Sequence, residues 1–278
     1  MKILCYINHF FGQNPHFLGK SSYPPGTSAA DVARKAEMRK RYVEQTIAQV
    51  RKLGDVDVKI CGIEGHSLVP LDITFEEIRN KPLWLIYESL NHMRQFVDQY
   101  DYFINLEDDI FIPEDTFQRI TEFDKDALVN EVFLPNRLEQ SAAGDRYCVD
   151  TMAIPGWTQQ RKKFKGKNLR VALNAHSGLV ILSREKFRYA MSRLDSGFRQ
   201  SLLHNELDSA FAYFHSPFAL YRSEDTEYHY VVHLDKWFYS PGEQMHENLW
   251  RYRWRTLKAT DFVPPIVVRG FFFILKKI

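Results

Sequence analysis

The feature that most constrains the fold is an alternation of strand-like and helix-like segments along the N-terminal part of the chain. Apolar, strand-like runs occupy residues 2–7, 56–63 and 101–112, and helix-like periodicity covers residues 29–53 and 75–99. This order is typical of βαβ units, in which helices cover a sheet of parallel strands. We therefore predict an α/β fold with a mostly parallel, twisted sheet flanked by helices. Ligands of such sheets bind beyond the carboxyl ends of the strands.

The first helix-like segment has clear end signals. Ser28 can cap its start, and Gly54 can end it. The remainder of the chain is less regular. Here we expect a strand at residues 131–139, a long loop at 140–170, and a strand followed by a helix from Ser183 at 178–194. We also expect a helix that starts at an Asn205 cap at 205–214, and a final strand, indicated by its alternating pattern, at 227–238.

Composition excludes several classes of protein. With 45% apolar and 14% aromatic residues the chain can bury a sizeable core, so disorder is not expected. The net charge of +2 is too balanced to indicate nucleic acid as a partner. The three cysteines, Cys5, Cys61 and Cys148, lie far apart and have no zinc-site spacing. They predict free thiols in a reducing compartment, and so a cytoplasmic protein.

The apolar runs at the two ends of the chain can be compared with the patterns of signal peptides and membrane segments. The apolar run before Asn8 is shorter than the core of a signal peptide, so we interpret it as the first strand. No stretch reaches the roughly 18 apolar residues of a membrane span. Residues 264–278 come nearest, with three phenylalanines followed by two lysines. They suit either a final strand or docked tail, or a monotopic anchor that gives peripheral membrane contact.

Three consecutive carboxylates, Glu107, Asp108 and Asp109, close the third predicted strand. Charged side chains are seldom buried without a partner, so this position needs a reason. At the carboxyl end of a parallel strand the acids would leave the buried sheet where a ligand crevice opens. Hard oxygen ligands of this kind suit Mg²⁺ or Mn²⁺. The structural alternative is an acidic turn before a helix that begins near residues 113–115.

With this acidic motif the chain resembles the GT-A glycosyltransferases, whose hallmark is a short DxD motif after a strand of a nucleotide-binding α/β fold. The resemblance implies that Asp109 holds a divalent metal, Mn²⁺ or Mg²⁺, with Glu107 as a further candidate ligand. Glu107 and Asp108 would contact metal waters, the ribose or the donor sugar. The resemblance also implies that Tyr6 and Asn8, at the end of the first strand, contact the nucleotide. His233 in the last strand would be a further metal ligand, with His229 in reserve.

The resemblance further implies one GT-A-like domain over residues 1–278. Residues 1–115 would form the half that binds the nucleotide-sugar donor, residues 116–250 the acceptor and catalytic half, and residues 251–278 a C-terminal extension.

Two later segments supply candidate substrate and catalytic residues in the order that this family uses. In "NAHSGLVILSREKF" Ser177 and Gly178 would let substrate approach the backbone, with His176 beside the acceptor; the alternative is an ordinary turn. In "HNELDSAF" Glu206 follows the predicted cap and would be the catalytic base, with Asp208 as second choice. A carboxylate at that place is also favoured by the helix dipole alone, and Asp208 suits a capping box.

Two basic clusters and one departure from the family pattern remain. The run at residues 161–170 suits a mobile loop that closes over the donor diphosphate, or a solvated loop. The cluster Arg34, Lys35, Arg39, Lys40 and Arg41 is expected to form a solvated or membrane-facing surface. Where many family members have small residues that contact the nucleotide, this chain reads "EIRNKPLWLIYESL". Arg79 or Lys81 would reach phosphate there instead.

The expected activity is therefore transfer of a sugar from a nucleotide-diphosphate-sugar to a hydroxyl of a glycan or lipid-linked glycan, with inversion because a base candidate is present. Two other classes stay open. A nucleotidyltransferase would use the same acids, although "NHFFGQNPHFLG" contains no glycine-rich phosphate loop. A non-catalytic carbohydrate-binding protein would stack sugars on aromatics such as Trp157, Trp237, Tyr239 and Trp250. The donor sugar, the base and the oligomeric state are left open.

Overall fold

The fold is seen in a computed structural model, which describes residues 1–13, 23, 25–140, 146–150, 157–175, 178–200 and 206–235. Its main sheet has the strand order β11-β4-β1-β2-β3. These strands are β1 (Lys2–Asn8), β2 (Asp55–Gly62), β3 (Ile73–Thr74), β4 (Tyr102–Glu107) and β11 (Leu179–Ser183). β1 pairs in parallel with β2 and β4, and β2 with β3, while β11 runs antiparallel to β4. The prediction of a mostly parallel sheet is confirmed for this sheet.

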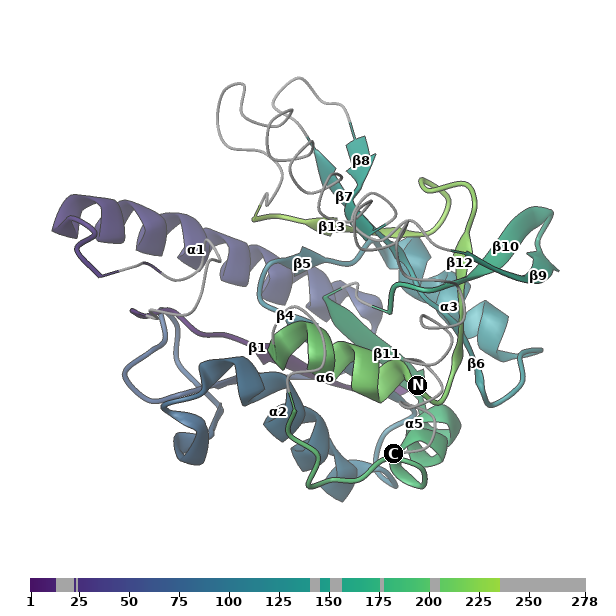
Figure 1. The fold of residues 1–278 in the computed structure, drawn as a ribbon, viewed down its shortest axis with the longest axis horizontal. Coiled ribbons are helices and arrows are strands. Elements are labelled where there is room, and N and C mark those ends of the chain that lie inside the picture. The colour runs from purple at the N-terminus through teal and green to yellow at the C-terminus, as the bar shows by residue number, and fades with distance from the viewer. Residues whose placement is uncertain are drawn as a thin grey trace, which may run out of the picture.

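Helices cover both faces of the main sheet, as Figure 1 shows. Alternate residues of β1 explain this arrangement: Leu4 and Tyr6 pack into one apolar cluster, and Ile3 and Ile7 pack into a second one on the other face. The first cluster includes α2 (Leu85–Met93), α5 (Arg184–Met191) and α6 (Glu206–His215), and the second includes α1 (Ala29–Val50) and α3 (Glu114–Asp124). β1 is therefore buried on both sides.

Two smaller sheets extend the fold beyond the main one. One has the order β6-β12-β10-β9 and the other the order β5-β13-β7-β8, and both mix parallel and antiparallel pairs. Their strands are β5 (Ile110–Phe111), β6 (Glu131–Phe133), β7 (Asn136–Gln140), β8 (Arg146–Cys148), β9 (Trp157–Phe164), β10 (Lys167–Ala172), β12 (Ala219–Ser223) and β13 (Tyr230–His233).

Several predicted elements have the expected position and end. The hydroxyl of Ser28 accepts a hydrogen bond of 3.2 Å from the backbone N–H of Asp31, so the predicted cap of α1 is confirmed. After α1, one 3₁₀ turn leads to Gly54, whose φ of +136° ends the helical run as predicted. Ser183 likewise occupies the cap position of α5, although its side chain makes no capping hydrogen bond.

Other predicted elements are shorter or divided. The helix expected at residues 75–99 is confined to α2, between the 3₁₀ turns Glu76–Ile78, Pro82–Trp84 and Arg94–Phe96. Pro82 has no N–H to continue a helix, which explains the break before α2. The strand expected at 101–112 divides into β4 and β5, and the strand expected at 131–139 divides into β6 and β7; in each case the two parts belong to different sheets.

The long loop predicted at residues 140–170 is also wrong where the structure describes this segment, because β8 occupies Arg146–Cys148 and β9 and β10 form a hairpin. Lys165 and Gly166 at its tip have φ values of +47° and +76°, as a two-residue hairpin turn requires. The predicted C-terminal strand or anchor at 264–278 lies outside the described residues, as do Trp237, Tyr239 and Trp250. Within the described ranges, no helix is long and apolar enough to cross a membrane.

Candidate functional site

The candidate site lies where β1 and β4 of the main sheet and β13 of a second sheet end together. β1 and β4 are parallel, with Asn8 opposite Glu107, so His9 and Asp108 directly follow at the same edge of the sheet. β13 reaches this edge because the backbone N–H of Leu234 donates to the carbonyl of Asp109 at 2.8 Å. The acidic motif is therefore placed at the carboxyl end of a parallel strand, which is where such sheets bind ligands.

Asp108 is buried, and both its oxygens contact side chains of the protein. One oxygen contacts Nδ1 of His9 and the other contacts Nη2 of Arg39 from α1. His9 accepts the N–H of Leu68 at Nε2, at 3.0 Å, so its Nδ1–H faces Asp108. Burial and the nearby Arg39 lower the pKa of His9 to about 3, which keeps its ring neutral. Asp108 thus anchors the end of β4 to β1 and α1.

Asp109 is buried too, but only one of its oxygens is engaged. Oδ2 accepts a hydrogen bond of 2.7 Å from Nη1 of Arg39 and lies 3.2 Å from Nε2 of His233. Burial alone would raise the pKa of Asp109, but attraction to Arg39 and His233 outweighs it and holds this pKa well below its usual range. Oδ1 is buried with no hydrogen-bond partner among the described residues. An orphaned carboxylate oxygen of this kind suits a cation.

His233 connects Asp109 to a second buried carboxylate. Its Nδ1 lies 2.7 Å from Oε1 of Glu139 on β7, while its Nε2 faces Asp109. Burial lowers the pKa of His233, but the two carboxylates outweigh that effect and raise it to about 10. A histidine that ligates a metal commonly holds a carboxylate at its other ring nitrogen, and Glu139 stands in that relation to His233.

Glu107 is half-buried and has Gly178 as a close neighbour. The Glu107 N–H donates to the carbonyl of Gly178 at 2.9 Å. A Cβ at Gly178 would lie 2.8 Å from Oε2 of Glu107, and the φ of Gly178 is +71°. Burial first, and then repulsion from Asp109, raise the pKa of Glu107 to about 7. The absence of a side chain at Gly178 therefore leaves the room that the Glu107 carboxylate occupies.

Glu107, Asp109 and His233 can hold a metal ion. Each offers one ligand atom, and these atoms lie within 4.8 Å of one another. Carboxylate oxygens with one imidazole form a ligand set suited to a divalent cation, and Mn²⁺ accepts both types. The unpartnered Oδ1 of Asp109 is the second observation that fits an ion here. Binding requires His233 to release its proton, because only the neutral imidazole is a ligand.

Arg39 is the residue of this site that sequence analysis placed wrongly. We predicted a solvated or membrane-facing cluster, but Arg39 is only 5% exposed. It shares helical spacing with Val43, Thr46 and Val50, which are all buried on the same face of α1. Its neighbour Arg41 is exposed and pairs with Glu37 on the helix surface. The apolar periodicity of α1, which includes position 39, is the signal that could have identified it.

Arg137 on β7 is a second cation that sequence analysis did not identify. Its Nε lies 3.3 Å from Oδ1 of the buried Asp150. Burial lowers the pKa of Arg137, but the charges of Asp150, Glu107, Glu139 and Asp208 outweigh this and raise it. Arg137 therefore carries its positive charge within reach of Glu107. Nothing in the strand pattern of this segment distinguishes Arg137 from an ordinary half-exposed residue.

The two candidate bases at the start of α6 lie in different surroundings. The charge of Asp208 raises the pKa of both Glu107 and Arg137. The charge of Glu206 acts instead on Tyr87, whose hydroxyl donates to the carbonyl of Gln200 at 3.0 Å. Asp208 is thus the candidate that the fold brings into electrostatic contact with the acidic motif.

The other predicted contact residues have partners elsewhere. The hydroxyl of Tyr6 lies 2.8 Å from Nδ1 of His92, and Nδ2 of Asn8 donates to Oδ1 of Asn105 at 2.9 Å. Arg79 pairs with Glu76, Lys81 lies over the ring of Trp84, and His229 stacks on Phe133. His176 and Ser177 lie outside the described residues.

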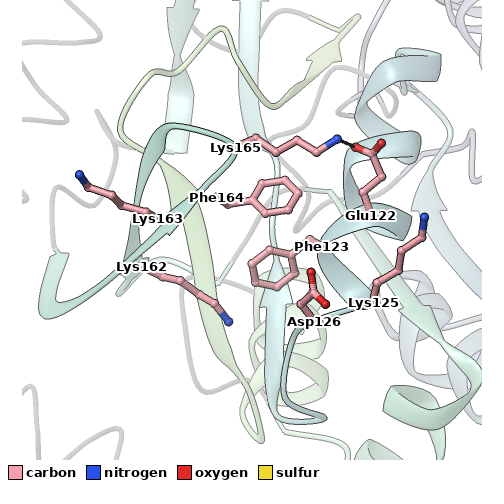
Figure 2. Close-up of a pocket in the computed structure, with 8 residues that line it drawn as sticks. All are labelled: Glu122, Phe123, Lys125, Asp126, Lys162, Lys163, Phe164 and Lys165. Atoms are coloured by element: carbon pink, nitrogen blue, oxygen red, sulfur yellow. Dashed lines mark hydrogen bonds and ion pairs between the residues drawn. The ribbon is translucent and has the colours of Figure 1, made fainter.

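The basic run lies away from the acidic motif. Figure 2 shows a pocket between the end of α3 and the β9–β10 hairpin, lined by Glu122, Phe123, Lys125, Asp126, Lys162, Lys163, Phe164 and Lys165. Lys162 pairs with Glu131, and Lys165 pairs with Glu122. The hairpin projects at the opposite end of the molecule from the start of α1 (Figure 1). In this structure the basic residues belong to the β9–β10 hairpin, with Lys165 in its two-residue turn, and the hairpin packs against α3.

Comparisons with known proteins found likenesses among solved structures. No protein-family model matches the sequence, and the search of curated proteins found no relative. Among solved structures, the chain is similar to a glycosyltransferase involved in glycosylation of the major capsid of PBCV-1. The likeness covers 91% of this chain and 100% of that chain, at 11% sequence identity and a TM-score of 0.32. A likeness at this level does not establish the family or the activity of this chain.

Proposed function

We propose that this chain is a glycosyltransferase that uses a divalent ion to bind a nucleotide-diphosphate-sugar and transfers the sugar to a hydroxyl group of an acceptor. The observation that carries the proposal is the convergence of Glu107, Asp109 and His233, whose ligand atoms lie within 4.8 Å of one another at the carboxyl end of β4. The order of short motifs along the chain, which resembles that of GT-A glycosyltransferases, supports the same class.

The residues that would hold the ion are Glu107, Asp109 and His233. When bound, a divalent ion would neutralise charge on the diphosphate and so favour departure of the nucleoside diphosphate. Glu139 fixes the ring of His233 through its contact with Nδ1. Asp108 has another role: its contacts with His9 and Arg39 hold the turn after β4 in position.

Arg137 is our candidate for contact with the donor phosphates. It is cationic, it lies within electrostatic reach of Glu107 and Asp208, and its side chain is 11% exposed. A guanidinium suits phosphate oxygens because it presents several N–H donors in one plane. Asp150 would keep it in place through the contact at Nε.

For the base that takes the proton from the acceptor hydroxyl, we now favour Asp208 over Glu206. The base must lie within hydrogen-bond reach of the acceptor hydroxyl as that hydroxyl attacks the donor sugar. Asp208 is the carboxylate of α6 whose charge reaches Glu107 and Arg137. Removing the base would lower turnover by about 10²- to 10⁴-fold while leaving donor binding in place. Glu206→Gln should retain activity within about threefold of the wild type if this assignment is right.

The test is release of nucleoside diphosphate from a panel of UDP-, GDP- and TDP-sugars, measured with Mn²⁺, Mg²⁺ or a chelator and with a mixture of glycan acceptors. Asp109→Asn should abolish release, whereas Asp115→Asn, an exposed acid paired with Arg119, should not. Release that is equal with and without metal, or equal in Asp109→Asn and wild type, would overturn the proposal. Pyrophosphate released from a nucleoside triphosphate would indicate a nucleotidyltransferase instead.

A further inference from the structure

The acidic motif already contains a cation that the protein supplies itself. Arg39 from α1 donates to Oδ2 of Asp109 at 2.7 Å, contacts Oδ1 of Asp108, and lies 3.4 Å from Oδ2 of Asp235. All four side chains are nearly inaccessible to solvent. One guanidinium thus faces three carboxylates, in a region where charges are weakly screened.

This arrangement has two physical consequences. Without Arg39, adjacent buried carboxylates would repel one another, and the turn after β4 would lose the contacts that hold it. With Arg39 present, any divalent ion that reaches Oδ1 of Asp109 meets a fixed positive charge at the other oxygen of the same carboxylate. The same guanidinium therefore stabilises the ion-free site and opposes the ion.

We propose that Arg39 is the resident counter-cation of the acidic motif and that it sets the affinity for the divalent ion by competing with it. This inference rests on the metal site of the proposed function, and goes beyond it by naming the residue that regulates the site. It predicts weak, reversible ion binding and a fold that is stable without metal. Arg39 acts here as a positioning residue, because its contacts are with Asp108, Asp109 and Asp235.

The test replaces Arg39 by residues that engage the aspartates less strongly. Arg39→Gln removes the charge and keeps an amide donor, whereas Arg39→Lys keeps the charge and loses the planar fork. Arg41→Gln is the matched control, because Arg41 lies on the same helix with its side chain 73% exposed. Mn²⁺ affinity would be measured by calorimetry and by the free Mn²⁺ signal in electron paramagnetic resonance. Thermal unfolding would be recorded with and without Mn²⁺.

We expect Mn²⁺ to bind at least about tenfold more tightly to Arg39→Gln than to the wild type, because this variant lacks the nearby positive charge. We expect about threefold tighter binding to Arg39→Lys, because this variant keeps the charge but loses the planar guanidinium that holds the aspartates. Both variants should melt below the wild type without Mn²⁺ and recover with it, and Arg41→Gln should match the wild type throughout. A merely structural role would instead weaken Mn²⁺ binding when the cluster is disturbed.

The inference is overturned if neither variant binds Mn²⁺ more tightly than the wild type, or if none of the proteins binds Mn²⁺ at all. If Arg39→Gln cannot be recovered folded, Arg39→Lys alone decides by the same criterion. Failure of this inference is separate from failure of the proposed function, because release of nucleoside diphosphate by the wild-type protein is measured independently of Arg39.

Discussion

Replacing Gly178 by alanine tests the packing of the acidic motif through a single methyl group. An ideal Cβ at this position would lie 2.7 Å from Cδ1 of Ile110 and 2.8 Å from Oε2 of Glu107, and the φ of +71° disfavours any side chain. The left-handed backbone costs about 1–2 kcal/mol, and overpacking adds about 1–3 kcal/mol. We therefore expect Gly178→Ala to lose roughly 2–5 kcal/mol of unfolding free energy.

The fold offers a matched control for the backbone term. Gly166, at the tip of the β9–β10 hairpin, has a φ of +76°, and a Cβ there would meet nothing within 4 Å. Gly166→Ala should thus lose only the backbone share, about 1–2 kcal/mol. The difference between the two variants isolates the contact with Glu107 and Ile110.

The assay is urea unfolding of both variants followed by a Mn²⁺ titration of each. Displacement of the Glu107 carboxylate should weaken Mn²⁺ binding in Gly178→Ala by about tenfold or more, because one of three ligands leaves its place, whereas Gly166→Ala should bind like the wild type. Equal unfolding free energies and equal Mn²⁺ affinities in the two variants would refute this account of how Glu107 is positioned.

Two further predictions concern buried groups behind the site. His215 donates Nδ1–H to the carbonyl of Ala175 at 3.0 Å, and burial lowers its pKa from 6.5 to about 4. Below pH 6.5 the unfolded chain therefore binds a proton that the folded chain does not, so the free energy of unfolding falls by about 3 kcal/mol between pH 6.5 and pH 4. Urea unfolding of the wild type and of His215→Gln across that range checks this. An equal dependence of unfolding free energy on pH in the two proteins would contradict it. Arg222 contacts Asp150 at 2.8 Å, and both side chains are 1% exposed, so Arg222→Met should lose roughly 3–5 kcal/mol of unfolding free energy. An unfolding free energy within about 1 kcal/mol of the wild type would show that Asp150 does not need Arg222 as a partner.

The three central strands of the main sheet, β4, β1 and β2, could be predicted because their signals are local. Strands that are buried on both faces read as continuous apolar runs, and the helix between β1 and β2 has a capping serine and a terminating glycine. The place of the acidic motif followed from the βαβ order alone. Asp109 and His233, 124 positions apart, were both singled out as metal ligands from short motifs, and the fold brings them within 3.2 Å.

The parts that could not be predicted depend on distant contacts. The run at 101–112 is continuous in sequence but divides at Asp108, because the residues after the turn pair with β13 in another sheet. Arg39 was hidden among surface cations, and only its partners 69 and 70 positions later give it a role. The choice between Glu206 and Asp208 likewise depends on where Glu107 and Arg137 lie, which no pattern along α6 reveals.

The central claim is that Glu107, Asp109 and His233 together bind a divalent ion. The most direct test is electron spin-echo modulation of Mn²⁺ bound to the protein, which detects nitrogen nuclei coordinated to the ion. The account predicts modulation from an imidazole nitrogen in the wild type that disappears in His233→Gln, while His229→Gln leaves it unchanged. A bound Mn²⁺ without nitrogen modulation, or with the same modulation in His233→Gln, would contradict it.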